Sequence, residues 1–264
     1  MNLGIPKVMG ILNVTPDSFY KESRSINQEN IRKRVQKMIS EGVDIIDLGG
    51  CSTRPGYIAP TIQEEWERVN LGCDIIREIA PDVPVSIDTF HADVAQKAIN
   101  FWKIDIINDI SGGADPDMWN VVAESRVCYV LTHNRKEENV NYTNVTANVI
   151  TDLSKKVNEL HKIGINDIII DPGFGFAKTI SENFTIFNNL EEFSRIGLPL
   201  LIGISRKSMI YKTLNCGPEE SLTGTIALNA IALEKGANIL RVHDVKEAKE
   251  TIKLYSYINQ LTDD

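Results

Sequence analysis

The chain alternates between short apolar runs and longer amphipathic stretches along almost its whole length. The apolar runs are rich in Ile and Val, and each ends in polar residues, which is typical of strands whose two faces are both covered. Eight runs occur, at residues 8–14, 44–50, 83–89, 105–111, 127–133, 167–173, 199–205 and 239–245. We predict a β-strand in each of them.

Segments of helical length separate these runs. Examples are residues 28–41, 63–79, 92–101, 151–163 and 219–234. Glycines such as Gly42 and Gly164 precede strands at points where a helix needs a left-handed cap. A strand followed by a helix is a parallel βαβ unit, and eight units in succession predict an α/β fold that closes into a (β/α)8 TIM barrel. Because no Pro- or Ser-rich linker interrupts the repeat, we assign residues 1–264 to a single domain.

Composition narrows the class of protein. A length of 264 residues suits one barrel, and 42% hydrophobic and 24% charged residues are ordinary for a soluble protein. The net charge of −8 argues against nucleic-acid and anionic-membrane partners. The chain shows neither a signal peptide nor a bilayer-spanning apolar run, and its four cysteines form no C-x-x-C pair. We therefore predict a cytoplasmic protein with reduced thiols.

Polar side chains stand at the end of every predicted strand, which is where TIM barrels carry their catalytic residues. In chain order they are Asn13, Asp47, Asp88, Asn108, His133, Asp171, Ser205 with Lys207, and Arg241 with His243. Residues two apart share a face of a strand, so we expect Arg241 and His243 to point the same way. We expect the same of Ser205 and Lys207 if strand seven reaches them. One polar strand end often only caps a helix, as Asp88 is placed to do, but eight together favour a functional site.

The strand-end residues form two chemical sets. Asp88, Asn108 and Asp171 offer carboxylate and amide groups, which suit the paired N–H donors of a planar polar heterocycle such as an aminopyrimidinone. Such groups would be costly to bury in a dry core, which favours a bound ligand. The second set is cationic and comprises Arg54, Arg206, Lys207, Arg241 and His243. In an acidic chain these cations indicate an anion site near strands seven and eight, although a solvated surface position is the alternative for Arg206.

Seven short motifs carry a resemblance to a known family. They are MGILNVTPDSF (residues 9–19), GGCSTRPG (49–56), SIDT (86–89), INDISGG (107–113), DPGFGF (171–176), SRKS (205–208) and RVHDV (241–245). In this order, between residue 8 and about residue 250, they resemble the motifs of the dihydropteroate synthases, which are pterin-binding TIM-barrel enzymes.

The resemblance implies an activity. The family makes 7,8-dihydropteroate for folate biosynthesis from 6-hydroxymethyl-7,8-dihydropterin diphosphate and p-aminobenzoate, and it releases diphosphate with the help of Mg²⁺. It also implies a homodimer, small-molecule substrates only, and a target of sulfonamides. Loss of diphosphate leaves a positive charge on the pterin methylene that the ring delocalises. The enzyme therefore has to orient the reactants and stabilise the leaving group, and we assign no general base.

The resemblance also implies roles for individual residues. Asp88, Asn108 and Asp171 would hold the pterin ring, and Lys207 would reach its carbonyl side. Arg241, His243, Thr53 and Asn13 would surround the diphosphate, with Asn13 near the metal. Lys207 and Ser208 would line the aminobenzoate pocket, while Asp17 belongs to the first loop and Arg54 to the second. The residues to which the resemblance gives catalytic roles are Lys207, Arg241, Asp17 and Arg54.

The chain departs from the family pattern in three places. Residues 20–24 read YKESR where the family usually has a glycine-containing segment, which changes how the first loop closes. Cys51 stands where a glutamate is common. Thr132 and Asn134 replace two methionines that flank a histidine, and because methionine packs on an apolar ring face, we expect pterin affinity to differ there.

Two other functions remain open. A methyltransferase that passes a methyl group from methyltetrahydrofolate to a corrinoid would share the Asp88, Asn108 and Asp171 set, but it has no diphosphate to expel and so no use for the SRKS motif. A catalytically degenerate pterin-binding homologue would explain the altered first loop, but not the retention of every other ligand residue.

Overall fold

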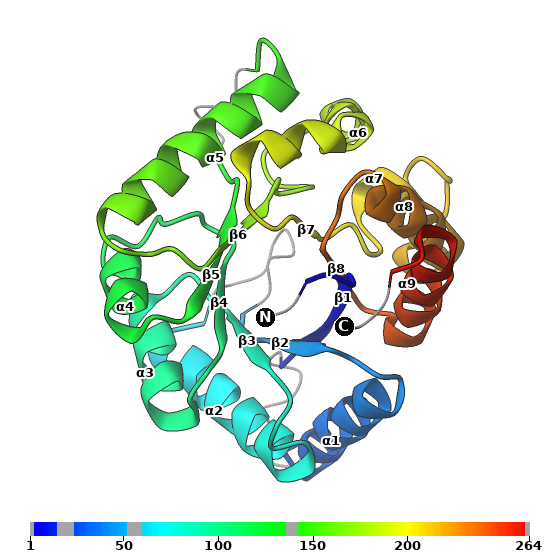
Figure 1. Cartoon of the computed structure of the whole chain (residues 1–264). Helices are drawn as coiled ribbons and strands as arrows, with labels where there is room; N and C mark the ends of the chain where they lie inside the picture. The colour runs from blue at the N-terminus through cyan, green and yellow to red at the C-terminus, as the bar shows by residue number, and fades with distance from the viewer. Residues whose placement is uncertain (1–2, 15–23, 52–59, 136–141, 262–264) are drawn as a thin grey trace.

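The computed structural model describes residues 3–14, 24–51, 60–135 and 142–261. In Figure 1 eight strands gather at the centre and the helices form a ring around them. The strands are β1 (Lys7–Asn13), β2 (Ile45–Gly49), β3 (Val85–Asp88), β4 (Ile106–Asp109), β5 (Cys128–Thr132), β6 (Ile168–Asp171), β7 (Leu201–Ile202) and β8 (Ile239–Val242). The predicted TIM barrel is confirmed.

All strand pairs are parallel, in the order β6-β5-β4-β3-β2-β1-β8-β7. The ring closes between β6 and the residues that precede β7. There Ile170 pairs with Leu200, and the Ile170 N–H donates to the Pro199 carbonyl at 2.9 Å. Closure brings all eight strand ends to one rim, as a barrel requires.

The helices follow the strands in the predicted alternation. They are α1 (Arg24–Ser40), α2 (Ile62–Ile79), α3 (Ala92–Trp102), α4 (Met118–Ser125), α5 (Val145–Lys162), α6 (Ile180–Asn188), α7 (Ser208–Tyr211), α8 (Leu222–Glu234) and α9 (Val245–Asn259), with 3-10 turns η3 (Leu190–Ile196) and η4 (Pro218–Glu220). Capping boxes begin α2, at Thr61 and Glu64, and α6, at Thr179 and Glu182. These side chains pair the backbone N–H groups that the first helical turn leaves open.

Several predicted boundaries differ from the structure, and three of them matter for the argument. Strand seven ends at Ile202 rather than 205, so Ser205 and Lys207 do not share a strand face, and Lys207 instead precedes α7 as its N-cap residue. Strand eight ends at Val242, because Asp244 is the N-cap residue of α9. Helix α5 begins at Val145, six residues before the predicted start at 151, because the Asn144 side chain accepts from the Ala147 N–H at 3.1 Å.

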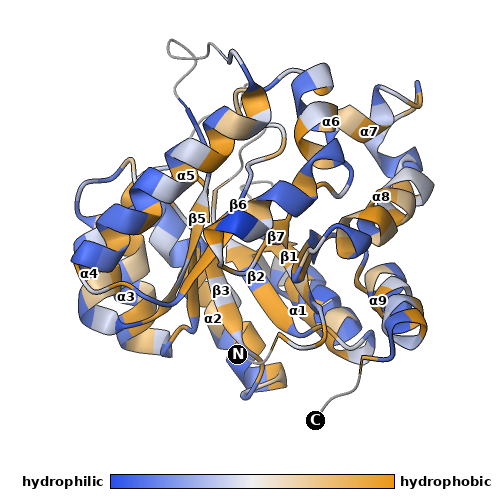
Figure 2. Ribbon diagram, turned by 45° about the horizontal axis from the view of Figure 1, so that its top comes forward, coloured by the Kyte–Doolittle hydropathy of each residue, from blue (hydrophilic) through white to orange (hydrophobic). Residues whose placement is uncertain are grey.

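Two apolar clusters hold the molecule together. The larger lies between the strands and the surrounding helices, and in Figure 2 the strands are accordingly mostly hydrophobic, whereas the helices carry many hydrophilic residues. The smaller fills the barrel interior with Met9, Ile45, Ile106, Val130, Ile169, Leu201 and Ile239. The interior is therefore a packed core, and any ligand has to bind above it, at the strand ends.

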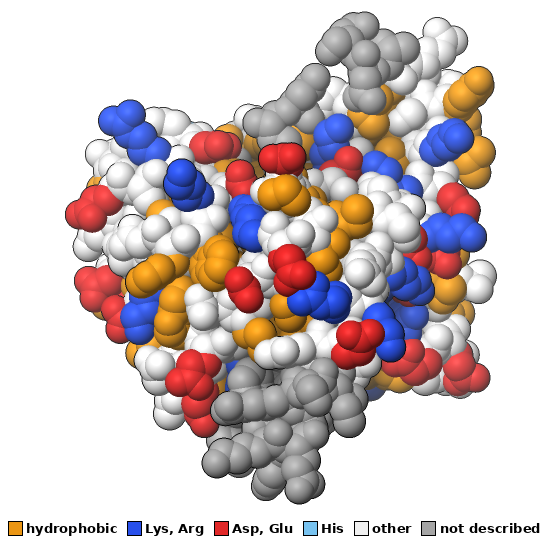
Figure 3. All heavy atoms as spheres, turned by 90° about the horizontal axis from the view of Figure 1, so that it is seen from below, with side chains coloured by type: hydrophobic (Ala, Val, Ile, Leu, Met, Phe, Trp, Pro, Cys, Tyr) orange, Lys and Arg blue, Asp and Glu red, His pale blue; other side chains and the backbone are white. Residues whose placement is uncertain are grey.

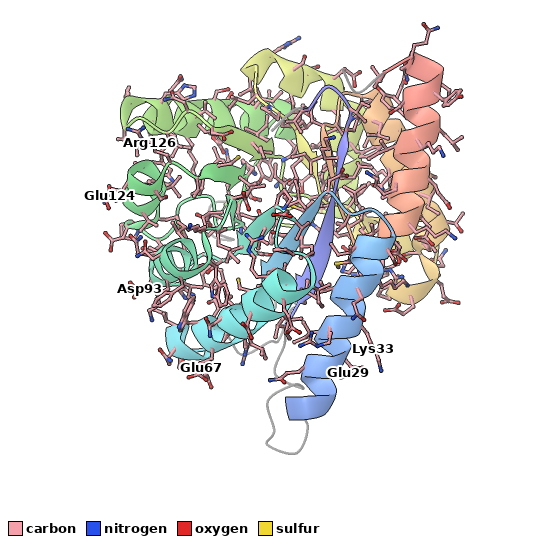
Figure 4. The ribbon with its side chains drawn as sticks, turned by 60° about the horizontal axis from the view of Figure 1, so that its bottom comes forward. Glu29, Lys33, Glu67, Asp93, Glu124 and Arg126 are labelled. Carbon is pink, nitrogen blue, oxygen red and sulfur yellow. The ribbon has the colours of Figure 1, made fainter. Side chains whose placement is uncertain are left out.

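Charged side chains cover the outer surface. Figure 4 labels Glu29 and Lys33 on α1 and Glu67 on α2, which point away from the barrel. Glu29 and Lys33 form an i,i+4 ion pair at 3.4 Å. Acidic and basic groups alternate on the face shown in Figure 3, with no broad patch of one sign. Among the described helices, none is long and apolar enough to cross a bilayer.

Candidate active site

A layer of polar side chains sits directly above the apolar filling of the barrel. Asp47, Asn108, Thr132, Asp171 and Arg241 each follow, by two residues, a member of the interior cluster on the same strand. Alternate residues of a strand face the same side, so all five point into the barrel mouth. Ser86 and Asp88 of β3 join them through hydrogen bonds described below. We call these seven residues the polar layer.

Asp47 is the centre of this layer. Its carboxylate is completely buried and accepts from the Ser86 hydroxyl at 2.6 Å, the Asn108 amide at 3.1 Å and the Arg241 Nε at 2.6 Å. A buried carboxylate needs several donors, because the burial of an unpaired charge costs a large amount of free energy. Since the Asn108 NH2 group donates to Asp47, its carbonyl oxygen is turned away from Asp47. That oxygen is buried and has no hydrogen-bond partner.

Arg241 connects the polar layer across the barrel. Besides the bond to Asp47, its Nη2 donates to Asp88 Oδ2 at 2.5 Å. Burial opposes the charge of Arg241, but the two carboxylates outweigh it and raise the pKa of the guanidinium. Burial raises the pKa of Asp88 to about 7, against the lowering effect of Arg241. Two of the five N–H donors of Arg241 serve these carboxylates, so three remain for other acceptors.

Asp88 and Asn13 approach each other over a residue that has no side chain. Strand pairing aligns Asn13 with Gly49 and Gly49 with Asp88. A Cβ atom at Gly49 would lie 3.2 Å from Asn13 Oδ1 and 3.6 Å from Asp88 Cβ. Asn13 is exposed, at the outer end of β1. Asp88 does not cap α3, whose N-cap residue is His91.

Asp171 and Lys207 form the other side of the mouth. Burial raises the pKa of Asp171, while the Gly173 N–H donates to its Oδ1 at 2.8 Å. Burial lowers the pKa of Lys207 to about 8, although the charge of Asp171 opposes the shift. Lys207 Nζ donates to the Phe174 carbonyl at 2.6 Å and lies 5.0 Å from the centre of the Phe176 ring. The lysine thus ties the segment after β7 to the segment after β6.

His243 lies at the rim beside Ser205. Its Nδ1 is 3.0 Å from the Ser205 hydroxyl, which also accepts from the His243 backbone N–H at 3.2 Å. The hydroxyl has one donor and two acceptor positions, so it can pair with Nδ1 in either tautomer of the ring. Burial, helped by the nearby charge of Arg241, lowers the pKa of His243 to about 4. The ring is therefore neutral at pH 7 and carries a single N–H donor.

Arg206 is not part of the polar layer. Its guanidinium donates to Asp244 at 3.0 and 2.7 Å and also pairs with Glu219. Both acidic partners lie outside the polar layer, so the structure does not join Arg206 to Arg241 in that layer, and its place in the cationic set stays a prediction. Ser208 begins α7 directly after Lys207. Asp17, Thr53 and Arg54 lie outside the described residues.

A second layer of side chains supports the segment after β6. Lys178 Nζ lies 2.9 Å from the Gly173 carbonyl, 3.1 Å from the Phe176 carbonyl and 3.1 Å from Nδ1 of His133. His133 in turn reaches Asp152 of α5 through Nε2, at 3.2 Å. Burial lowers the pKa of His133 to about 4 and that of Lys178 to about 7. His133 is thus buried behind the rim, where it stabilises the neighbouring segment.

Glu65 stabilises, in a similar way, the segment that follows β3. It is completely buried on α2, accepts from the Thr89 hydroxyl at 2.6 Å and lies 2.6 Å from His91 Nδ1. One turn later, Arg68 donates to the Gly50 carbonyl at 2.9 Å. These contacts fix the backbone directly after Gly49 and Asp88.

The sequence alone did not assign roles to Asp47, Ser86, Glu65 or Lys178. Asp47 carried a signal, since it is a carboxylate two residues after an apolar strand position. Ser86 and Glu65 bond side chains on other segments, and Lys178 bonds mainly backbone carbonyls, so no local pattern of residue types indicates these partners. At the opposite end of the barrel, Arg77, Asp82, Phe101, Trp102 and Lys103 line an open groove that is remote from the strand ends.

Comparisons with known proteins agree on one family. Residues 9–243 match the family model described as pterin binding enzyme. The dihydropteroate synthase of Clostridium beijerinckii is 43% identical over 257 residues, which cover 95% of this chain and 93% of the relative.

Solved structures show the same likeness. The dihydropteroate synthase of Xanthomonas albilineans with 4-aminobenzoic acid superposes with a TM-score of 0.92 at 32% identity, over 99% of this chain and 96% of the other. A structure of the enzyme from the same organism, in complex with 7,8-dihydropteroate, superposes with a TM-score of 0.88 at 30% identity, over 99% and 97% of the two chains.

Proposed function

The chain belongs to the family of pterin-binding enzymes, and we propose that it joins 6-hydroxymethyl-7,8-dihydropterin diphosphate to p-aminobenzoate, forming 7,8-dihydropteroate and diphosphate. The observation that carries this proposal is the polar layer, in which acidic and amide groups at the strand ends face a common mouth beside Lys207 and Arg241. The ligands named for the Xanthomonas albilineans structures, 4-aminobenzoic acid and 7,8-dihydropteroate, are a substrate and the product of this reaction.

The pterin ring binds against Asp88, Asn108 and Asp171. The aminopyrimidinone edge of a pterin offers neighbouring N–H donors, and a carboxylate accepts two such donors in one plane. The unpaired carbonyl oxygen of Asn108 is a further acceptor, fixed in direction by Asp47. Lys207 supplies the donor for the ring carbonyl. A bound ring would thus pair groups that are costly to leave buried and unpaired.

The diphosphate lies above the ring, towards β8. Three N–H donors of Arg241 do not serve Asp47 or Asp88 and are available for phosphate oxygens. The neutral ring of His243 lies on the same side of the mouth. Thr53 and Arg54 of the second loop and Asp17 of the first complete the proposed site. One guanidinium group can bind two phosphate oxygens at once, so it can stabilise the charge that builds up on the leaving group.

The donor set near Asn13 fits Mg²⁺. This ion takes oxygen ligands and commonly combines one or two protein groups with substrate phosphates and water. Asn13 offers an exposed side-chain oxygen at the strand end, close to Asp88. Within the described residues no three His, Cys, Asp or Glu side chains form a metal cluster, and a phosphate-held ion does not need one. When bound, Mg²⁺ neutralises the departing diphosphate.

The residues of this chain then act by orientation and electrostatics. The bond between the pterin methylene and the diphosphate oxygen breaks, and the electron pair leaves with the oxygen towards Arg241 and His243. The arylamine nitrogen forms the new bond to the methylene and then releases its proton to solvent, since we assign no general base. Lys207 and Ser208 line the pocket that holds p-aminobenzoate, and sulfonamides, which mimic p-aminobenzoate, compete there. Holding the amine within reach of the methylene removes much of the entropic barrier.

The remaining parts of the proposal concern assembly and location. The outer face of α8 and α9 exposes Ile231, Leu254, Tyr257 and Ile258, whereas the polar Thr225 and Asn229 of α8 are buried. Exposed apolar groups on two neighbouring helices are typical of a contact surface, and we propose the homodimer interface there. No disulfide joins the four cysteines, which suits the cytoplasm.

The test is the formation of dihydropteroate by the purified protein from both substrates with Mg²⁺, followed by product chromatography. We expect diphosphate release that depends on p-aminobenzoate. A folded protein that binds pterin but forms no product would favour the degenerate homologue. Methyl transfer from methyltetrahydrofolate to a corrinoid would favour the methyltransferase.

A further inference from the structure

The side chain of Thr132 occupies a distinctive place in the polar layer. It lies at the end of β5, between Asn108 on β4 and Asp171 on β6, and it pairs in register with Asp171. Val130, two residues earlier, belongs to the interior apolar cluster, so Thr132 faces the barrel mouth. Its methyl carbon lies 3.3 Å from the position that a Cβ at Gly173 would take. The methyl therefore faces the segment after β6, and the hydroxyl is turned away from it.

The hydroxyl of Thr132 has no protein partner. The residue is completely buried, and its Oγ1 is without a hydrogen bond, as is Oδ1 of Asn108. Two unpaired polar atoms on the inner side of adjacent strands are unusual, because buried polar groups are nearly always paired. The rest of the layer is densely bonded through Asp47 and Arg241. Tyr142, Asn229 and Ser256 also keep a buried unpaired oxygen, but they are not members of the polar layer. The two unpaired atoms within the layer indicate that a ligand, rather than the fold, completes them.

Asn134, two residues after Thr132, differs from it because its polar group has a partner in the protein. Both Thr132 and Asn134 depart from the methionines of the family pattern. The Asn134 side-chain amide donates to the Ile110 carbonyl at 3.0 Å and so joins the segments after β4 and β5. Its polar group has a structural use that accounts for its presence. The hydroxyl of Thr132 has no such structural use among the described residues.

We infer that Thr132 is a specificity-determining residue whose hydroxyl forms a hydrogen bond with a polar atom on the edge of the pterin ring, beside the bond made by Asn108 Oδ1. This inference rests on the proposed function. A methionine in this position can offer only an apolar contact to a ring face. Thr132 replaces that contact with a directional bond, and the site thereby discriminates against flat bicycles that lack a polar atom there.

Three substitutions isolate the hydroxyl. Thr132→Val keeps the branched shape and removes the oxygen, whereas Thr132→Ser keeps the oxygen and removes the methyl. Ser256→Ala, on α9, is the matched control, because its hydroxyl is also buried and unpaired but lies outside the barrel mouth. The probe is 6-hydroxymethylpterin, titrated into the full-length protein by calorimetry. This probe lacks diphosphate, so only contacts to the ring and its hydroxymethyl group are measured. Thermal unfolding without ligand accompanies each titration.

We expect Thr132→Val to weaken pterin binding by about tenfold, the equivalent of one ordinary hydrogen bond. Thr132→Ser should bind within about twofold of the parent protein on the same scale, since it retains that bond. The unliganded Thr132→Val protein should melt no lower than the parent, because it loses an unpaired buried group. Ser256→Ala should bind pterin as the parent does.

Other results would overturn the inference. Equal pterin affinity of the Val variant and the parent would show that the hydroxyl does not touch the ring. Equal losses in the Val and Ser variants would show that the methyl contact with Gly173 matters instead. Failure of the proposed function is distinguishable, since it would appear as absent pterin binding or absent dihydropteroate formation in the parent protein itself.

Discussion

The substitution Asp47→Asn probes the polar layer without changing its volume. The carboxylate accepts from Ser86 on one oxygen and from Asn108 and Arg241 on the other. An asparagine can keep its carbonyl oxygen towards Asn108 and Arg241 and turn its NH2 group to Ser86, whose hydroxyl can rotate to accept. The hydrogen-bond count is therefore conserved, and the main loss is the negative charge beside the buried Arg241.

The magnitude follows from what remains around Arg241. Breaking a buried ion pair outright costs about 3–5 kcal/mol, but Asp88 stays within 2.5 Å of the guanidinium and keeps it paired. The loss is then closer to that of one charge-assisted hydrogen bond, about 2 kcal/mol. Relief of the repulsion between Asp47 and Asp88 offsets a part of it. For a domain of this size, about 2 kcal/mol corresponds to a fall in Tm of roughly 4–8 °C.

Urea denaturation followed by circular dichroism measures this loss. Asp44→Asn is the matched control, because Asp44 directly precedes β2 and so lies at the opposite end of the barrel from Asp47. Its side chain is 21% exposed and pairs with Lys249 at 2.9 Å. Such a partly exposed pair contributes about 1 kcal/mol or less. The Asp47→Asn protein should also lose at least about tenfold in kcat/KM, because Asn108 loses its charged anchor. If Asp47→Asn destabilises the protein no more than Asp44→Asn does, the central role given to Asp47 is wrong.

Three other predictions concern single residues. Arg241→Ala should weaken calorimetric binding of the pterin diphosphate far more than that of 6-hydroxymethylpterin, and equal losses would make Arg241 merely structural. Asp171→Asn should reduce pterin affinity about tenfold or more, because it removes a charged acceptor facing ring N–H donors; a change below about threefold would contradict this. The pKa of His133 is about 4 in the folded protein against 6.5 for the free ring, so the unfolded chain takes up the proton first as pH falls. His133 should thus lower the free energy of unfolding by about 3 kcal/mol between pH 6.5 and about 4, and His243, with the same pKa, adds a similar share. His133→Gln should therefore reduce that slope in urea melts, and a slope equal to that of the parent would refute the assignment.

The barrel was predictable because its signal is local. Each strand is an apolar run, and parity within the run indicates which polar residue faces inward. That reasoning leads to Asp88, Asn108 and Asp171 without knowledge of the fold's contacts. Strand seven shows the limit of such reasoning, since its apolar run continues to residue 205 whereas its ladder ends at Ile202.

The pairing of the side chains was not predictable, because it depends on segments far apart in the chain. Arg241 and Asp47 are separated by 194 positions, and only barrel closure brings them together. Arg206 has the residue type of an anion ligand, but its guanidinium donates to Asp244, 38 positions away and outside the polar layer. Lys178 acts on backbone carbonyls, which leave no trace in residue types. Residue type alone therefore predicted a set of cations near the strand ends, but not which of them the fold brings into the polar layer.

The central claim is that the polar layer at the strand ends holds a pterin ring. A crystal structure of the protein with 6-hydroxymethylpterin tests it most directly. We predict the ring in the barrel mouth, with its aminopyrimidinone edge within hydrogen-bond distance, roughly 2.7–3.2 Å, of Asp88, Asn108 or Asp171. A ring bound instead in the groove lined by Arg77, Phe101 and Trp102, at the other end of the barrel, would contradict the account.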